Sequence, residues 1–181
     1  MEHFERKLES QQIYQGKILS LRCDKVELED GRTAFREVID HHGGVAILAV
    51  DDQDHILFVS QFRYAVGEQL LELPAGKLEL GENPRACGIR ELEEECGCTA
   101  DEFFLLGRMY PTCAYDTETI HIFFARGLHP AKQHLDDGEF LTVKRIPAQE
   151  AFRMVLEGEL PDGKTQLGIL KYKALRDAGR L

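Results

Sequence analysis

The stretch Gly76–Cys98 reads GKLELGENPRACGIRELEEECGC, and it decides how the rest of the chain is interpreted. Its second half has the start and stop signals of a helix. Asn83 suits the N-cap, Pro84 the first helical position and Gly97 a left-handed C-terminal stop. Four glutamates lie between these signals. Like charges three or four residues apart on a helix repel by a few tenths of a kcal/mol per pair, so this crowding requires an explanation.

Three of the four glutamates are expected to share one face of the helix. At about 100° per residue, Glu94 and Glu95 lie about 60° and 40° to either side of Glu91. Clustered carboxylates supply the oxygen ligands and negative charge that hard cations such as Mg²⁺ or Mn²⁺ require. The alternative is a solvated acidic helix face, because glutamate-rich helices are common.

The other side of the helix is expected to face a core. Glu93 falls on that side and is the one acid not assigned to the shared face. Two small residues one turn earlier on the carboxylate side, Cys87 and Gly88, are expected to leave room for a ligand. The residues expected to face the core are Ile89, Leu92 and Cys96.

The bulk composition bounds the class of protein. With 181 residues, 43% of them hydrophobic and 30% charged, the chain is expected to form one globular domain with a small appendage. A net charge of -10 argues against a nucleic-acid or membrane partner. No apolar run approaches the roughly 20 residues of a membrane span, and no secretory signal is visible. The five cysteines lack a C-x-x-C pair, which favours idle thiols in a reducing compartment, so a cytoplasmic location is expected.

The hydrophobic pattern predicts an α/β domain with a mixed sheet. Residues 1–42 are expected to form a small N-terminal antiparallel β element, and residues 43–181 the main domain. The last expected helix has an apolar stripe of Leu167, Ile169, Leu170 and Leu175. The first expected hairpin pairs strands at 17–28 and 34–41 around an Asp30-Gly31 turn, and a second pairs 43–52 with 55–66. Further strands are expected on either side of a bend within 68–80, and within 101–112, 119–129 and 135–146. Closing helices are expected at 147–158 and 164–179.

The spacing of the polar residues resembles a known motif. The Nudix box is G-x5-E-x7-R-E-U-x-E-E-x-G-U, where U is a bulky aliphatic residue, and only Cys98 departs from it. "VSQFRYAV" and "YPTCAYDTETIHIFFA" further resemble ADP-ribose pyrophosphatases of the Nudix hydrolase superfamily, and Pro111 is a mark of that subfamily. The resemblance implies a Nudix α/β/α sandwich. The matching positions are Gly76, Glu82, Arg90, Glu91, Leu92, Glu94, Glu95 and Gly97.

The resemblance implies metal-dependent hydrolysis of the pyrophosphate bond of ADP-ribose, or a related ADP-sugar, to AMP and a sugar phosphate. Two to three Mg²⁺ ions, or Mn²⁺, would serve each site. Two alternatives stay open. One is a pyrophosphatase for another nucleotide compound, such as a GDP-sugar, FAD, NADH or an oxidised nucleotide. The other is a non-catalytic module that senses ADP-ribose, which the intact box acids disfavour.

The resemblance also assigns roles to the box and its surroundings. Glu91 and Glu95 would be metal ligands, and Glu94 a ligand or a group that positions water. The general base would lie on an acidic loop, where either Asp137 or Glu139 fits. The supporting positions are the Ala75 carbonyl as a further metal ligand, Arg90 orienting the glutamates, and Glu82 and Gly76 in structural roles.

Substrate contacts are implied outside the box. Arg63 matches an arginine that binds the substrate phosphates. Arg36 resembles one that reaches the substrate from the partner subunit, because these enzymes are homodimers with exchanged N-terminal β elements and shared active sites. Glu118 matches a substrate-contacting acid, although Cys113-Ala114 replaces the usual Pro-Gly before it.

A second motif points to a different chemistry. Gly158–Thr165, GELPDGKT, formally satisfies the P-loop pattern G-x4-G-K-[ST]. A P-loop follows a buried strand and opens a core helix, whereas this segment follows a helical pattern and contains Pro161. It is interpreted as a turn between the two closing helices.

Overall fold

The computed structural model describes residues 3–181, which form two compact units. Unit 1 comprises the N-terminal residues up to Gly43 together with Tyr110–Thr119. Unit 2 comprises Gly44–Met109 and Ile120–Leu181.

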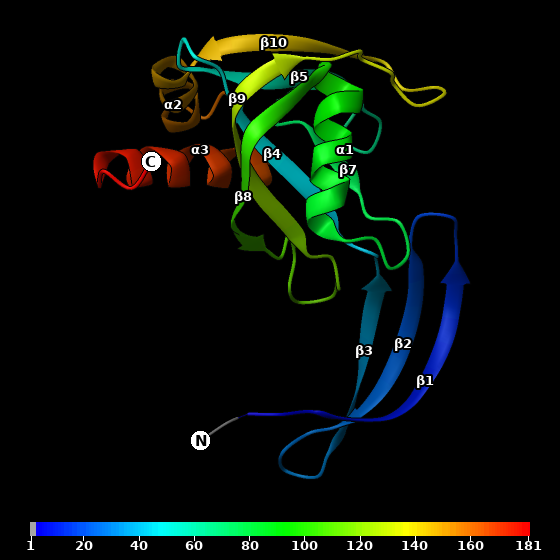
Figure 1. Ribbon diagram of the computed structural model, residues 1–181. Helices are drawn as coiled ribbons and strands as arrows, with labels where there is room; N and C mark the ends of the chain where they lie inside the picture. Colours follow the sequence, from blue (N-terminus) through cyan, green and yellow to red (C-terminus); the bar gives the residue numbers. More distant parts are fainter. Residues whose placement is uncertain (1–2) are drawn as a thin grey trace. The chain divides into compact units, whose positions relative to one another are not determined.

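Unit 1 is built on a three-stranded antiparallel sheet in the order β1-β2-β3 (Figure 1). The hairpin predicted around Asp30-Gly31 is confirmed, and Gly31 has the positive φ of 82° that such a turn favours. The first strand was not predicted, because all ten of its residues are exposed and it shows no apolar alternation. The strands are β1 (Arg6–Gln15), β2 (Ser20–Glu27) and β3 (Thr33–Asp40).

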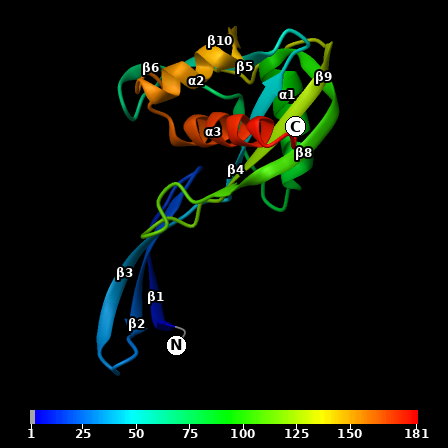
Figure 2. The same ribbon diagram turned by 90° about the vertical axis from the view of Figure 1, so that its left-hand side faces the viewer.

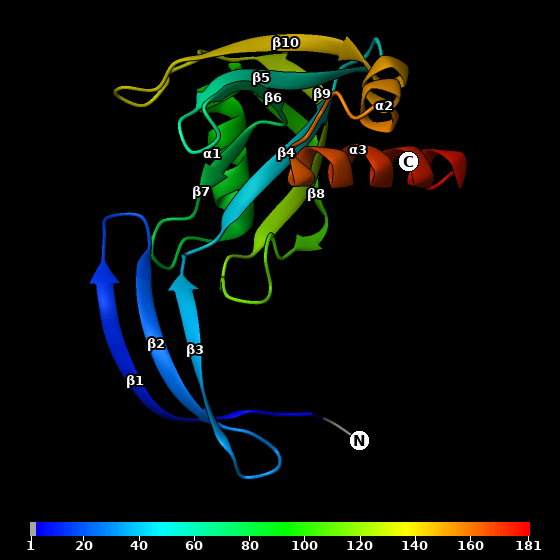
Figure 3. The ribbon, with the colours of Figure 1, turned by 180° about the vertical axis from the view of Figure 1, so that it is seen from behind.

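Unit 2 contains a mixed seven-stranded sheet whose main path is β10-β5-β4-β9-β8 (Figures 1 and 3). Strands β4 and β9 are parallel, and the other pairs are antiparallel. The strands are β4 (Gly44–Val50), β5 (His55–Arg63), β6 (Glu68–Glu72), β7 (Ala75–Lys77), β8 (Cys98–Met109), β9 (Ile120–Pro130) and β10 (Leu141–Pro147).

The central strands depart from the simple hairpin that was expected. β4 and β5 share only the pair Val50–Ile56, next to their turn. Beyond it, β7 pairs with the first half of β4, and the Ile47 amide donates to the Pro74 carbonyl at 2.8 Å. β5 pairs instead with β6 and β10. This insertion places Ala75 beside the central strand of the sheet.

Helices cover both faces of this sheet, which confirms the predicted α/β/α sandwich (Figure 2). α1 (Pro84–Cys96) packs on one face, over a cluster that includes Ile47 and Phe123. α2 (Ala148–Leu156) and α3 (Gly163–Asp177) pack on the other, over a cluster that includes Phe58. None of the helices between residues 3 and 181 is long and apolar enough to cross a membrane.

The apolar stripe predicted for α3 is partly wrong. Ile169 is buried and Leu175 packs against the core, but Leu167 and Leu170 are exposed. Gly168 takes the central core position, because a Cβ there would lie only 2.8 Å from Leu73 Cδ1. The missing side chain therefore lets α3 approach the sheet closely.

Candidate active site

The helix that carries the glutamates begins and ends where the sequence predicts. The Asn83 side chain accepts hydrogen bonds from the amides of Arg85 (2.9 Å) and Ala86 (3.3 Å). Gly97 adopts φ 61°, and its amide donates to the Glu93 carbonyl at 2.9 Å. Local capping thus fixes the length of α1.

The buried face of α1 differs from the expected one. Leu92 is buried and Cys96 packs against the core, but Ile89 is 36% exposed. Glu95 is buried instead, with 2% of its surface exposed. The helix is therefore rotated relative to its apolar pattern, because one of its acids packs inward against β7.

The two small residues of α1 serve packing and not ligand access. Cys87 is fully buried. A Cβ on Gly88 would lie 2.8 Å from Phe103 Cζ and 3.3 Å from Phe123 Cδ2. The expectation that these residues leave room for a ligand is wrong, since the rings of β8 and β9 occupy that space.

The half-buried Glu91 and the buried Glu95 form a carboxylate pair beside β7. The Ala75 amide donates to Glu95 Oε2 at 2.9 Å. Burial, reinforced by the charges of Glu91 and Glu139, raises the pKa of Glu95 to about 8. Burial and the neighbouring acids Glu94 and Glu139 likewise raise the pKa of Glu91 to about 7, against the attraction of Arg90. These carboxylates repel one another in a poorly solvated place.

Gly76 makes room for one of these carboxylates. A Cβ at this position would lie 1.9 Å from Glu91 Oε1 and 2.0 Å from its Cδ. The Glu91 side chain therefore packs directly over the β7 backbone. Glycine is required at this position because it lacks a side chain, and not because of its conformational freedom.

Arg90 joins three acids. Its Nη1 lies 2.8 Å from Glu91 Oε1 and donates to Glu94 Oε2 at 2.6 Å. Its Nε donates to Glu82 Oε1 at 3.3 Å, and the other Glu82 oxygen accepts from the Glu79 amide at 3.0 Å. The structure thus places Arg90 where it can orient the box glutamates, and Glu82 where it anchors Arg90 to the loop before α1.

The acidic loop brings one of its two candidate bases to the carboxylates. Glu139 is half-buried, interacts electrostatically with both Glu91 and Glu95, and accepts a hydrogen bond from Gln61 Nε2 at 3.4 Å. A turn closed by the Glu139 amide and the Asp136 carbonyl, at 3.0 Å, directs it there. Asp137 is exposed on that turn.

Arg63 lies at the end of β5, close enough to Glu95 for each charge to favour the other's ionised form. Its Nε donates to Glu72 Oε1 at 2.6 Å and its Nη2 to Oε2 at 3.1 Å. Glu72 is 2% exposed and also accepts a hydrogen bond from Lys164 Nζ. Burial opposes ionisation of Glu72, but the hydrogen bonds from Arg63 and Lys164 outweigh it and lower its pKa.

The donor set suits a hard divalent cation. The clustered groups are carboxylate oxygens, which Mg²⁺ and Mn²⁺ prefer, and the raised pKa values of Glu91 and Glu95 reflect a repulsion that a cation would relieve. Within residues 3–181, however, no three Asp, Glu, His or Cys side chains already form a metal-binding group. The carboxylates of Glu91 and Glu94 are turned toward Arg90.

Two predicted substrate residues belong to unit 1. Arg36 on β3 donates from Nε to Glu5 Oε2 at 2.9 Å. Glu118 lies 3.4 Å from His41 Nδ1, and its amide donates to Asp116 Oδ1 at 2.8 Å. Neither contact involves the residues of α1.

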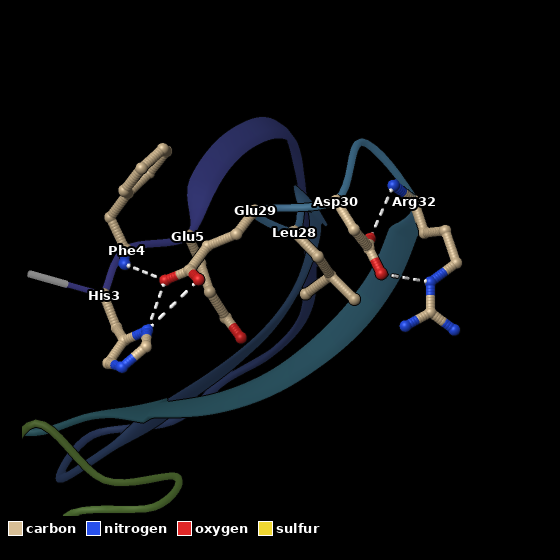
Figure 4. Close-up of a pocket in the computed structure, with 7 residues that line it drawn as sticks. All are labelled: His3, Phe4, Glu5, Leu28, Glu29, Asp30 and Arg32. Atoms are coloured by element: carbon tan, nitrogen blue, oxygen red, sulfur yellow. Dashed lines mark hydrogen bonds and ion pairs between the residues drawn. The ribbon is translucent and has the colours of Figure 1, made fainter. Parts of the chain in front are cut away.

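Unit 1 also contains an open pocket of about 540 Å³ (Figure 4). The Glu29 carboxylate accepts from the Phe4 amide at 2.9 Å and lies 2.9 Å from His3 Nδ1, which ties the N-terminal segment to the β2–β3 turn. Asp30 and Arg32 pair within that turn. None of the predicted site residues lines this pocket.

Sequence reasoning missed three residues that contact the predicted site directly or, for Lys164, through Glu72. Glu72 was read as part of a strand, and Lys164 as part of a turn with a formal P-loop match. Gln133 was not considered, although its Nε2 donates to the Glu95 carbonyl at 2.6 Å at the end of α1. The acid within the apolar run Leu70–Pro74 was a usable signal, because a buried acid requires a cationic partner.

The chain matches two family models and is similar to known proteins along almost its full length. The NUDIX domain model matches residues 40–166, and the nucleoside diphosphate sugar hydrolase N-terminal domain model matches residues 5–39. An ADP-ribose pyrophosphatase of Bacillus subtilis (strain 168) is 38% identical over 176 residues, covering 96% of this chain and 95% of the relative. A methanol dehydrogenase activator of Bacillus methanolicus is 34% identical over 176 residues, with the same coverage.

A solved structure shares the fold over almost its full length. The crystal structure of an ADP compounds hydrolase superimposes with a TM-score of 0.85 at 18% sequence identity. The match covers 98% of this chain and 97% of the other.

Proposed function

Because the chain belongs to the NUDIX domain family, we propose that it hydrolyses the pyrophosphate bond of ADP-ribose, releasing AMP and ribose 5-phosphate. The Bacillus subtilis relative supports this choice, since it is an ADP-ribose pyrophosphatase and aligns with 96% of the chain. The observation that carries the proposal is the carboxylate pair of half-buried Glu91 and buried Glu95, whose pKa values are raised to about 7 and about 8 beside the Gly76 backbone.

The acids of α1 would hold the divalent cations on which the reaction depends. We assign Glu91, Glu95 and the Ala75 carbonyl as ligands, with Glu94 as a further ligand or a group that positions water. Two to three Mg²⁺ ions, replaceable by Mn²⁺, fit the hard oxygen donors. When bound, such ions neutralise phosphate oxygens and activate water. Arg90 would keep Glu91 and Glu94 in place, as its contacts of 2.8 and 2.6 Å to them suggest.

Glu139 is the better candidate for the general base. It interacts with both Glu91 and Glu95, whereas Asp137 is exposed on the turn. One Glu139 oxygen already accepts from Gln61 Nε2, which would orient the carboxylate to take a proton from the attacking water. Arg63, beside Glu95, would bind the substrate phosphates.

The base assignment can be tested by comparing two variants. Glu139→Gln should lower kcat by about 100-fold or more, the usual contribution of a general base, while Asp137→Asn should leave kcat close to that of the wild type. The reverse pattern would move the role to Asp137. Unchanged turnover in both variants would remove the acidic loop from the mechanism.

Unit 1 is proposed to form a homodimer with a second copy of the chain. Val26 is its only buried hydrophobic residue among those that the structure describes. By contrast, large apolar side chains are exposed on or beside its strands, among them Phe4, Ile13, Tyr14 and Phe35. A sheet with so little core of its own is stabilised by a partner surface.

In such a dimer, Arg36 and Glu118 would contact the substrate, with Arg36 reaching the site of the partner. Light scattering should give twice the 20.6 kDa of one chain, and a clean monomer would overturn the dimer. Mixing Arg36→Ala with Glu95→Gln protein should restore some turnover after subunit exchange, because one site of each mixed dimer is then intact. No recovery in a mixed dimer would place Arg36 outside the partner's site.

The partner is proposed to be a small nucleotide substrate and not a nucleic acid or a membrane, in keeping with a net charge of -10. The cysteines are all free, which suits the reducing cytoplasm.

The proposed reaction is tested by incubating the purified protein with Mg²⁺ and a panel of nucleoside diphosphate sugars, flavin and nicotinamide dinucleotides and oxidised nucleotides. We expect AMP and ribose 5-phosphate from ADP-ribose at the highest kcat/KM. Glu91→Gln and Glu95→Gln should lose most of the rate. Binding of ADP-ribose without turnover would favour a sensing module, and no turnover of any diphosphate would refute the enzymatic function.

A further inference from the structure

The formal P-loop match at Gly158–Thr165 has a structural use within unit 2. Asp162 caps α3, accepting from the Thr165 amide at 2.9 Å and from Lys164 Nζ at 2.9 Å. Thr165 Oγ1 accepts from the Leu73 amide at 2.9 Å. The first turn of α3 is thereby fastened to the segment that joins β6 to β7.

Lys164 connects the first turn of α3 to Glu72 and, through Glu72, to Arg63 of the proposed active site. Its ammonium binds the buried Glu72 carboxylate, and the same carboxylate receives both Nε and Nη2 of Arg63. Two cations on one buried anion make a strong and geometrically defined contact, because charge-assisted hydrogen bonds are stronger where water is excluded. Arg63 remains 38% exposed, and its Nη1 has no hydrogen-bond partner among residues 3–181.

We propose that Lys164 is a positioning residue for substrate binding: through Glu72 it holds Arg63 in the orientation that binds the substrate phosphates. The inference rests on the proposed function, since it assumes that Arg63 meets a pyrophosphate.

Two physical effects support this role. Lys164 Nζ and Arg63 Nη2 share Glu72 Oε2, so Lys164 helps to set the plane of the carboxylate against which the guanidinium lies. Lys164 also balances charge. Arg63 and Lys164 offset Glu72 and Asp162, so removing Lys164 leaves one uncompensated negative charge beside a site that must accept an anionic diphosphate.

The decisive experiment is a double-mutant cycle on KM for ADP-ribose with Mg²⁺ present. Lys164→Met should raise KM on the order of 10-fold, the typical effect of losing a charged hydrogen bond. It should change kcat little, because Arg63 would bind substrate and transition state alike. In an Arg63→Ala background the same substitution should have almost no further effect on KM. Lys164→Arg should recover most of the affinity.

The matched control is Lys173→Met. It removes the same charge from the same helix, but its ion pair is with Asp177 and not with Glu72. Its KM should equal that of the wild type. If Lys164→Met does not fold, Lys164→Gln, which keeps a donor, carries the same cycle.

The outcomes separate the inference from the function on which it rests. An active wild type in which Lys164→Met lowers Tm but leaves KM unchanged would refute the positioning role. So would an effect on KM that persists undiminished without Arg63. A wild type that cleaves no nucleoside diphosphate sugar would instead refute the proposed function, and this inference would fall with it.

Discussion

Replacing Gly76 by alanine adds one methyl group and should disable the site without unfolding the protein. The new Cβ would lie 1.9 Å from Glu91 Oε1, whereas ordinary contacts begin near 3.4 Å, so the carboxylate must move by about 1.5 Å. A misplacement on the order of 1 Å at a reacting centre can cost about 100-fold in rate. We therefore expect kcat/KM for ADP-ribose to fall roughly 100-fold, equivalent to about 2.7 kcal/mol of transition-state stabilisation.

The assay is AMP release under steady-state conditions with Mg²⁺, accompanied by Mn²⁺ binding measured by electron paramagnetic resonance. Gly163→Ala is the matched control, because its Cβ would meet only Met109 Cε at an ordinary 3.8 Å. Circular dichroism and thermal melting should show that the Gly76→Ala protein is folded, because alanine is more favourable than glycine in the interior of a strand. Mn²⁺ affinity should fall with the rate, because the displaced group is the proposed ligand.

Two results would refute this reasoning. A Gly76→Ala protein with the kcat/KM of the Gly163→Ala control would show that the position of Glu91 over β7 does not matter to the reaction. A loss of rate that merely follows a loss of folded protein would show that Gly76 serves the fold alone.

Three further predictions concern stability. Gly88→Ala would place its Cβ 2.8 Å from Phe103 Cζ, so overpacking should lower the free energy of unfolding by about 1–3 kcal/mol. The urea midpoint should fall while the folded protein keeps its kcat, and an unchanged midpoint would contradict the prediction. Without divalent cations, stability should fall as pH rises from about 5 to about 8. The folded-state pKa values of Glu91 and Glu95, about 7 and about 8, exceed the ordinary 4.5, so the folded protein binds more protons in that window. Urea midpoints measured in EDTA should show this fall, Glu95→Gln or added Mg²⁺ should lessen it, and stability that rises over the window would refute the pKa assignments. Gly97→Ala should lower the free energy of unfolding by about 1–2 kcal/mol, because the backbone angle φ of 61° disfavours a residue with a side chain. An unaltered urea midpoint would contradict the left-handed cap.

The features that the sequence predicted well are those that local chemistry determines. Asn83, Pro84 and Gly97 each satisfy or terminate backbone hydrogen bonds within one turn, so the bounds of α1 could be read from neighbours in the chain. The same holds for the Asp30-Gly31 turn, where the residues carry the conformation themselves. The Nudix spacing added what no local rule could supply, namely which acids to consider together.

Features that depend on distant partners could not be read in this way. β1 is entirely exposed, so no apolar alternation marks it as a strand. The pairing of β7 with β4, which displaces most of the expected β4–β5 hairpin, depends on contacts between segments about 30 residues apart. Whether Asp137 or Glu139 faces the carboxylates depends on a turn whose orientation only the packed loop shows.

The acids explain why the face of α1 was misjudged. Helical wheels assume that apolar side chains point inward and charged ones outward. Glu95 breaks this rule: the Ala75 amide and Arg63 favour its ionised form but offset only part of the effect of burial, so its pKa stays raised. Glu72 breaks it in β6, where Arg63 and Lys164 outweigh the effect of burial and lower its pKa. A buried acid with a raised pKa, such as Glu95, costs stability, so a chain that retains it on the inner face of a helix gains something other than stability from it. The two acids that break the hydrophobic pattern, Glu95 and Glu72, therefore belong to the proposed site or hold one of its residues.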